Sequence, residues 1–327
     1  IFKLSYSSLS SLGVDMNNLQ TSAIKLYGNG GGMLPKLNSD FRHNDLPEIA
    51  IKIHDSNNNG VFESNDYLLF YGMSPHIWKF NESSTLFEHE LHLFSDNVYY
   101  FLTVDNQSEG KRVELKNTLL NPTKTITDYN AFLYHEQELE NIINSGKKWF
   151  GEQFSYENSQ NFSFNFPNLV LSEPITIKTA VVARSLQTSN FKISANSAII
   201  NSLNVPNIVT DYATEYAKEA SNTSTFISNS SNVNINLEYS SSDNSAEAWL
   251  NYLQINASRK IKLSGNYLIF RDTKNISNEI GKFEIENANG VSVWDVTNTK
   301  NVKFLQTNSS GSLVSFNDSL NSIKEYI

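Results

Sequence analysis

Short runs that alternate apolar and polar residues, separated by clusters of Asn and Ser, dominate the chain after Trp149. Successive side chains of a strand point to opposite faces of a sheet, so this period of two indicates strands with one buried face. Turn residues recur at roughly the 8–12-residue spacing of a sandwich. The clearest runs are NFSFNF (161–166), ITIKTAVVA (175–183), VNINLEY (233–239) and WLNYLQINA (249–257). We predict an antiparallel β-sandwich over residues 149–290.

The preceding part of the chain has a more mixed pattern. Residues 1–125 predict a mixed α+β domain with a short helix near Tyr6–Leu12 and strands over 23–27, 48–54, 67–71 and 97–105, the last of them well buried. The run Asp211–Ser221, within the predicted sandwich, fits a helix or a strand, and both remain open. The expected fold class is mainly β with some α.

A connecting helix is predicted over residues 126–148. Within Tyr129–Ser145, apolar residues recur on one broad helical face, and Gly146 follows as a left-handed cap. Those apolar residues are Phe132, Leu133, Leu139, Ile142 and Ile143. At the other end of the chain, we expect residues 291–327 to form strands that lead toward a C-terminal domain absent from this sequence.

Charge and composition exclude several classes of function. The formal net charge is -9, and no Lys/Arg cluster is present, which argues against a nucleic-acid partner. The chain has no cysteine, so it contains no disulfide, thiolate metal site or cysteine nucleophile. No apolar run approaches the roughly 20 residues that cross a bilayer, so no transmembrane segment is expected.

The segment DSNNNGVFESND, residues 55–66, has the spacing of a twelve-residue calcium loop. Calcium prefers six to eight oxygen ligands, and Gly60 would allow the sharp turn that such a loop makes. The candidate ligands are Asp55, Asn57, Asn59, the backbone carbonyl of Val61, Glu63 (directly or through water) and Asp66. The expected cofactor is a structural Ca²⁺ ion.

A different interpretation of the same segment is a polar hairpin turn, which Asn and Gly favour without any metal. The twelfth residue is Asp66 where a Glu would reach further, and the run before the loop (EIAIKIH) predicts a strand, so this is not a helix–loop–helix site. A calcium ion here would bind weakly and stabilise the turn. It would not be catalytic.

Two further motifs are weaker. GNGGG, residues 28–32, lacks the Lys-Ser/Thr pair of a phosphate-binding loop and predicts a plain glycine turn. His89 and His92 are spaced one residue too closely for H-E-x-x-H, and we expect exposed imidazoles on a strand or loop. Since no G-x-S-x-G elbow is present either, the residues alone indicate a non-enzymatic β-rich protein or fragment.

A succession of segments carries a resemblance to a known family. In order, these are IFKLSYSSLSSLGVD, IKLYGNGGGMLP, DSNNNGVFESNDYLLFYG, LFSDNVYYFLTVD, HEQELENIINSGKKWFGE, AWLNYLQINA and VWDVTN. Together they resemble the N-terminal region of the PorU family, the gingipain-like cysteine peptidases that act as sortases of the type IX secretion system in Bacteroidetes. The resemblance covers essentially the whole chain, and its sharpest pieces are LYGNGGG with NDYLLFYG, and HEQELENIINSGKKWFGE.

The resemblance implies a non-catalytic, extracytoplasmic role at the outer membrane or cell surface. Members of this family cleave the C-terminal sorting domain from secreted cargo and attach the cargo to surface lipopolysaccharide. Their His–Cys dyad lies in a gingipain-type domain C-terminal to the matched region, so no catalytic residue is carried over to this chain. The implied partners are the parent's own peptidase domain, subunits of the secretion system, or sorting domains of the cargo.

The alternative is a free-standing cell-surface module for adhesion or glycan binding. It would consist of the sandwich and the calcium loop alone. The remainder of the reading frame distinguishes the two hypotheses, because only the first requires a downstream His and Cys in a gingipain-like context.

Overall fold

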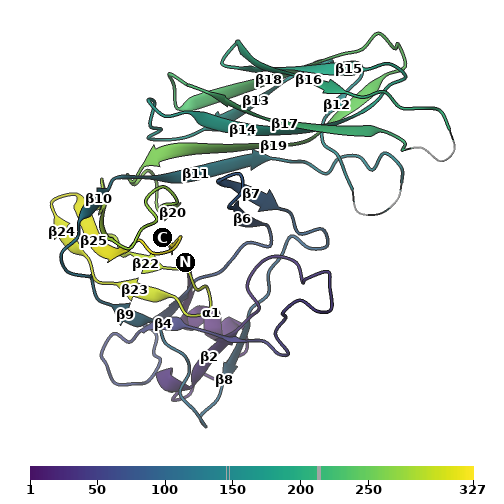
Figure 1. Cartoon of the computed structure of the whole chain (residues 1–327). Helices are drawn as coiled ribbons and strands as arrows, with labels where there is room; N and C mark the ends of the chain where they lie inside the picture. Colours follow the sequence, from purple (N-terminus) through teal and green to yellow (C-terminus); the bar gives the residue numbers. More distant parts are fainter. Residues whose placement is uncertain (145, 147, 212–214) are drawn as a thin grey trace. The chain divides into compact units, whose positions relative to one another are not determined.

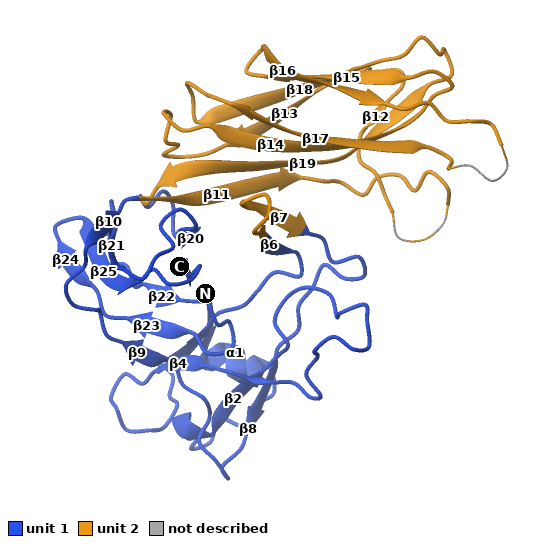
Figure 2. Ribbon diagram, viewed as in Figure 1, with its two compact units in different colours: residues 1–79, 90–127, 262–327 blue, residues 80–89, 128–261 orange. Residues whose placement is uncertain are grey.

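The computed structural model describes residues 1–144, 146, 148–211 and 215–327 (Figure 1). The chain forms two compact units, each built from segments far apart in the sequence (Figure 2). Unit 1 comprises residues 1–79, 90–127 and 262–327, and unit 2 comprises residues 80–89 and 128–261. Most of the sheet pairing is antiparallel, and the described helices are α1 (Tyr6–Ser11) and the 3₁₀ turn η1 (Thr21–Ala23). The prediction of a mainly β fold with some α is confirmed.

Unit 2 contains two antiparallel sheets that share a core. The first has the order β11-β19-β14-β17, with β12 paired to β19, and the second has the order β13-β18-β15-β16. The rings of Phe154 and Phe191, one from each sheet, lie 5.1 Å apart. The first sheet consists of β11 (Asp128–His135), β12 (Gln153–Phe154), β14 (Ile175–Arg184), β17 (Lys218–Phe226) and β19 (Glu247–Lys260). The second consists of β13 (Ser159–Asn165), β15 (Ser189–Ala195), β16 (Ala198–Val205) and β18 (Asn232–Ser240).

The alternating runs of the sequence become these strands. In β18, Val233, Ile235 and Leu237 are fully buried, while Asn232 and Asn234 are exposed. The same alternation holds in β13, where Phe162 and Phe164 are buried. The four runs that were predicted as strands are confirmed as β13, β14, β18 and β19.

The predicted connecting helix is wrong. Residues 128–135 form β11, which pairs with β19 along its whole length, from Asp128 opposite Lys260 to His135 opposite Leu253. Tertiary pairing overrides helix propensity here, because Tyr129 and Ala131 are buried at strand spacing. Residues 136–144 are also non-helical, and Leu139 and Ile143 of the expected apolar face are more than half exposed. Ser145 and Lys147 lie outside the described residues.

The segment Asp211–Ser221 fitted either a helix or a strand, and the structure decides between them for part of it. Its last residues, from Lys218, begin strand β17. Residues 212–214 lie outside the described residues.

Unit 1 begins with two three-stranded sheets. The orders are β1-β5-β4 and β3-β2-β8. Buried side chains of this half form one cluster that includes Leu9, Ile24, Leu26, Phe62 and Leu68. The strands are β1 (Phe2–Ser5), β2 (Ile24–Tyr27), β3 (Glu48–Ile49), β4 (Ile51–His54), β5 (Tyr67–Phe70) and β8 (Phe101–Val104). A separate hairpin of β6 (Ile77–Asn81) and β7 (Leu86–Glu90) contains the boundary between the units.

The C-terminal strands complete unit 1. One sheet has the order β10-β21-β25-β24, and another has the order β20-β26-β22-β23-β9. The rings of Phe270, Phe283, Phe316 and Tyr326 pack together in this half, with centroid distances of 4.9 to 6.5 Å. The strands are β9 (Glu114–Lys116), β10 (Lys124–Ile126), β20 (Phe270–Arg271), β21 (Ile280–Ile285), β22 (Trp294–Asp295), β23 (Lys303–Leu305), β24 (Asn308–Ser310), β25 (Leu313–Ser319) and β26 (Glu325–Tyr326).

The two units differ from the predicted domains 1–125, 126–148, 149–290 and 291–327. The sandwich begins at β11 and ends with β19, and residues 262–327 return to the first unit. Two parallel strand pairings join residues 262–327 to the first part of unit 1: β10 pairs with β21, and β9 pairs with β23. Pairing between segments so distant in sequence leaves no local pattern, which explains the difference.

One strand prediction is right in position and wrong in burial. The segment 97–105 contains β8, but β8 is an edge strand with only β2 beside it. Phe101 is 54% exposed and Val104 is 39% exposed. Aromatic and β-branched residues therefore indicated a strand here without indicating a buried one.

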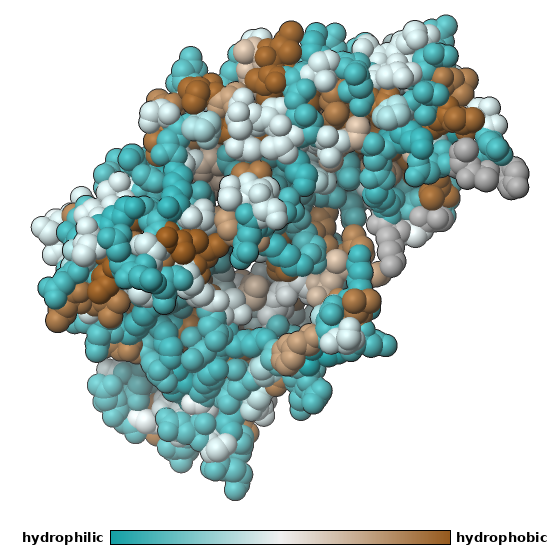
Figure 3. Space-filling model, in the orientation of Figure 1, coloured by the Kyte–Doolittle hydropathy of each residue, from teal (hydrophilic) through white to brown (hydrophobic). Residues whose placement is uncertain are grey.

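The surface is largely polar on the face shown in Figure 3, where apolar side chains form small separate groups. In the described part of the chain, no helix is long and apolar enough to cross a membrane.

Candidate functional site

The loop of residues 55–66 is the complete connection between β4 and β5. His54 pairs with Tyr67 as the last residue pair of the hairpin, so all twelve loop residues lie beyond the ladder. A second segment holds the loop from outside, since the backbone N–H of Thr21 donates to the Gly60 carbonyl at 2.9 Å and that of Phe62 donates to the Leu19 carbonyl at 2.7 Å. The loop is thus a fixed part of unit 1.

Side-chain oxygens at the first, third and fifth positions turn back onto the loop's own backbone. Asp55 Oδ2 accepts the N–H of Gly60 at 2.8 Å. Asn57 Oδ1 accepts the N–H of Asn59 at 3.2 Å, and Asn59 Oδ1 accepts that of Val61 at 2.7 Å. These three side chains therefore fold over the same turn, which the positive φ of Gly60 (79°) makes possible.

Asp66 closes the base of the loop. Its two carboxylate oxygens accept the backbone N–H groups of Ser56 (2.8 Å) and Glu63 (2.7 Å), and the residue is 2% exposed. Burial opposes ionisation of Asp66, but these hydrogen bonds outweigh it and lower its pKa. Asp66 is therefore held as an anion whose main contacts are structural.

One oxygen of the loop fits a cation. Asp55 Oδ1 is buried and has no hydrogen-bond partner among the described residues. Glu63, the ninth position, lies next to the third, because its Oε2 accepts from Asn57 Nδ2 at 2.7 Å. No three His, Asp or Glu side chains of the described residues converge to hold a metal by themselves. An ion here would need the amide and backbone oxygens of the loop as well.

The two histidines of the HELH motif lie in different surroundings. His89 is buried, whereas an exposed imidazole was expected. Its side chain is 4% exposed, with Nε2 2.5 Å from Glu136 Oε2 and Nδ1 3.0 Å from Gln254 Oε1. In His92, Nδ1 accepts the backbone N–H groups of Phe94 (3.2 Å) and Ser95 (3.0 Å). These ring nitrogens serve as hydrogen-bonding groups of the fold.

GNGGG is a tightly packed glycine turn. A Cβ on Gly31 would lie 2.0 Å from the backbone oxygen of Ser74, so no larger residue fits. The N–H of Gly31 is directed at Met73 Sδ, 3.4 Å away. Close packing and the positive φ of Gly30 and Gly32 account for the glycines without a phosphate.

A buried ionic network in unit 1 was missed by the sequence analysis. Asp318 is 2% exposed and contacts Lys116 Nζ at 2.5 Å, Lys324 Nζ at 2.7 Å and the Tyr326 hydroxyl at 2.9 Å. Lys116 also pairs with Asp295 at 2.9 Å. Burial works against the ionised carboxylate, but the two lysines outweigh it and lower the pKa of Asp318. Lys116 and Asp295 lie far in the sequence from the segment that contains Asp318, Lys324 and Tyr326, so the network forms no motif that a sequence could reveal.

Comparison with known proteins gives an informative match among the solved structures. No model of a known protein family matches the chain, and neither does any curated protein. The fold makes the chain a two-unit, mainly antiparallel β protein. More specifically, its fold is similar to that of part of the crystal structure of dimeric latent PorU from Porphyromonas gingivalis, with a TM-score of 0.80 and 19% sequence identity. The match covers 99% of this chain and 30% of that one, so the chain spans less than a third of the structure it resembles.

Two carbohydrate-binding modules of the CBM36 type are also similar to part of the chain. One comes from a multidomain xylanase of the hindgut metagenome of Trinervitermes trinervoides; it has a TM-score of 0.26, 12% identity, and coverage of 43% of this chain and 98% of the module. The other, in complex with calcium and xylotriose, has a TM-score of 0.23, 12% identity, and coverage of 40% and 99%. At these TM-scores the likeness supports no inference about this chain.

Proposed function

We propose that this chain is a non-catalytic part of a PorU-like cysteine peptidase of the type IX secretion system. The observation that carries the proposal is the fold, which is similar to that of a PorU region over 99% of the chain at a TM-score of 0.80. The absence of cysteine agrees with it, because the nucleophile of a cysteine peptidase must then lie elsewhere in the parent protein. The setting would be extracytoplasmic, at the outer membrane or cell surface.

In this proposal the parent protein cleaves sorting domains from secreted cargo and attaches the cargo to surface lipopolysaccharide. The chain would position the peptidase domain, or bind a subunit of the secretion system or a sorting domain.

The proposal is tested with purified parent protein and with residues 1–327 alone. The substrate is a cargo polypeptide that spans the junction with its sorting domain. We expect the parent to cleave this junction, a thiol-alkylating reagent to abolish the cleavage, and residues 1–327 to leave the substrate intact. Turnover by residues 1–327 that persists after alkylation would contradict the proposal.

We further propose that the loop of residues 55–66 binds one structural Ca²⁺ ion. The support is the unpaired, buried Asp55 Oδ1, together with the fold-back of Asn57 and Asn59 over the same turn. Backbone carbonyl, amide and carboxylate oxygens are the ligands that calcium prefers. The ion would stabilise unit 1 and take no part in peptide cleavage.

A further inference from the structure

The segment Phe80–His89 of unit 2, here called the strap, packs against the first sheet of that unit. The ring of Phe87 lies 4.7 Å from that of Phe132 on β11, and the ring of His89 stacks on that of Tyr134 at 4.3 Å. The next residue of β11 points the other way and packs on the second sheet. The strap therefore covers the outer face of the first sheet.

Two amide side chains of β19 hold the backbone of the strap. Asn256 bonds Phe87 in both directions: its Oδ1 accepts the N–H at 2.8 Å, and its Nδ2 donates to the carbonyl at 3.0 Å. The buried side chain of Gln254 accepts the backbone N–H of His89 on Oε1 at 3.1 Å. In the described part of the chain, β7 forms a strand ladder only with β6. Individual side chains thus fasten the strap to β19 in place of a backbone ladder.

The hydrogen bonds of His89 determine where its ring carries protons. Because Gln254 Oε1 accepts the backbone N–H of His89, it is an acceptor for Nδ1 as well, which lies 3.0 Å away and must donate. The other ring nitrogen, Nε2, lies 2.5 Å from Glu136 Oε2. A neutral imidazole has a proton on only one nitrogen, so its second would direct a lone pair at this carboxylate. The geometry therefore requires an imidazolium ion paired with Glu136.

Other titratable side chains surround the ring. Tyr134 stacks on its face, and Tyr252 meets it edge-on at 5.1 Å. Burial first, and then the charge of the neighbouring carboxylate, raise the pKa of Tyr134. On the strap itself, Glu88 pairs with Lys178 of β14 at 3.1 Å. Tyrosine, glutamate and lysine ordinarily titrate far from neutral pH, so the imidazole is the group of this cluster whose charge changes there.

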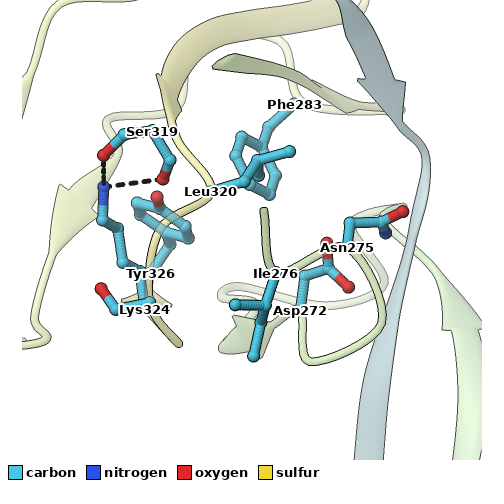
Figure 4. A pocket seen from close by; sticks show the side chains of 9 residues that line it. Asp272, Asn275, Ile276, Phe283, Ser319, Leu320, Lys324 and Tyr326 are labelled. Atoms are coloured by element: carbon cyan, nitrogen blue, oxygen red, sulfur yellow. Dashed lines mark hydrogen bonds between the residues drawn. The ribbon is translucent and has the colours of Figure 1, made fainter. Parts of the chain in front are cut away.

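The buried ionic network of unit 1 lacks such a group. Lys324, for example, donates to the backbone carbonyl of Ser319 at 2.8 Å and to its hydroxyl at 2.6 Å (Figure 4). A lysine ordinarily keeps its charge up to about pH 10, so bonds of this kind persist through the neutral range. An unfolded histidine loses its proton near pH 6.5.

We propose that His89 and Glu136 form a proton-dependent latch that fixes the strap on the outer face of the sheet. When the Nε2 proton passes to solvent, a lone pair faces the carboxylate oxygen at hydrogen-bond distance, and the latch opens. Above about pH 6.5 the latched chain binds one proton more than the unfolded chain, so the stability that the latch supplies falls as the pH rises. This latch goes beyond the proposed peptidase role and does not depend on it.

The test is hydrogen exchange of residues 1–327 at pH 7 and pH 9, each rate corrected for the intrinsic exchange rate at that pH. We expect the protection of the backbone N–H groups of Phe87 and His89 to fall about tenfold from pH 7 to pH 9, as a difference of one unit in proton affinity requires. In Glu136→Gln, the new amide can donate to a neutral Nε2, so protection should hold at both pH values. Glu88→Gln, the same substitution at a residue paired with Lys178, is the matched control and should keep the native response.

The nitrogen-15 spectrum of the histidine rings reads the protonation state directly. At pH 7 both ring nitrogens of His89, identified through its contact with Tyr134, should carry protons. His92 provides the contrast, because its Nδ1 accepts two backbone N–H groups and should be unprotonated.

An unprotonated ring nitrogen in His89 at pH 7 would overturn the proposal, even if Glu136→Gln does not fold. Equal protection of the strap at pH 7 and pH 9 in the native chain would overturn it too. So would a full native response in Glu136→Gln.

Discussion

The carboxylate of Asp55 reaches across the hairpin loop and accepts the backbone N–H of Gly60 at 2.8 Å, while its second oxygen is buried without a partner. The bonded oxygen shapes the turn. The other is the oxygen that we propose as a calcium ligand, because a buried anionic oxygen without a partner is unfavourable.

Calcium should therefore stabilise the chain through Asp55. We expect chelator-stripped protein to bind one Ca²⁺ ion by isothermal titration, and a hundredfold excess over the dissociation constant to add about 2.7 kcal/mol to the free energy of unfolding. Asp55→Asn keeps an oxygen for the Gly60 N–H and removes the charge, so it should abolish this gain while changing the calcium-free stability little. Equal stability losses with and without calcium would identify the segment as an Asn-rich turn.

Two glycines should respond to alanine for different reasons. Gly60 has φ of 79° with open space around an added Cβ, so Gly60→Ala should cost only the backbone strain of about 1–2 kcal/mol. In Gly31→Ala the new Cβ meets the Ser74 backbone oxygen at 2.0 Å, and the cost should be larger. Urea unfolding of both variants gives the comparison. A Gly31→Ala variant as stable as Gly60→Ala would show that the turn at residues 28–32 can move away from the Ser74 backbone and is not tightly packed against it.

The buried network around Asp318 should make unit 1 sensitive to acid. The folded state lowers the pKa of Asp318, so its contribution is present above the unfolded pKa of about 4 and is lost as the pH falls through the folded value. Asp318→Asn should cost about 3–5 kcal/mol near neutral pH, since it leaves Lys116 and Lys324 short of their counter-charge. The loss should shrink below pH 4, which unfolding curves at several pH values will show.

The control for that variant is Glu114→Gln. Glu114 pairs with Lys303 at 2.6 Å, but its side chain is 71% exposed and the pair is solvated. Its removal should change the stability far less than Asp318→Asn does. Comparable losses in the two variants would contradict a special role for the buried network.

Trp249 should anchor the segment that follows β11. The side chain is 2% exposed, and its Nε1 donates to Glu140 Oε2 at 2.7 Å. Trp249→Phe removes a hydrogen bond to a charged acceptor and should destabilise unit 2 by about 1.5–3 kcal/mol. Trp149→Phe, at a residue that is 42% exposed, should have little effect. The reverse order in thermal unfolding would mean that residues 136–144 are not held through Trp249.

The sequence predicted those features whose signal is local. Strand β18 repeats its apolar residues at every second position, and the loop of residues 55–66 contains all its candidate ligands within twelve residues. The prediction of a helix after Tyr129 was wrong because the apolar residues there also fit a helical face. What determines the structure is the pairing of β11 with β19, which lies more than a hundred residues later in the sequence. The local spacing of apolar residues does not show which distant strand a segment pairs with.

The sites in the C-terminal half of unit 1 could not be predicted for the same reason. Lys116 and Asp318 are 202 residues apart in the sequence, yet they form one ion pair. Asp272 is unremarkable as a single Asp in a loop and becomes notable only when its burial and its unpaired oxygen are known. The ion pair and the buried Asp272 both depend on how distant segments come together in the fold, more than on the residue types themselves.

The measurement that tests the central claim most directly is the maturation of secreted cargo in the native host after an in-frame deletion of residues 1–327 from the parent gene. Immunoblots should follow the cargo, its sorting domain and the remaining peptidase. We predict that the cargo keeps its sorting domain in the deletion strain. A strain in which the catalytic cysteine of the parent is replaced should show the same defect. Where the parent protein without residues 1–327 is stable, supplying these residues from a second gene copy should restore cleavage. Normal cleavage and surface attachment of cargo in the deletion strain would contradict the claim and favour a free-standing surface module.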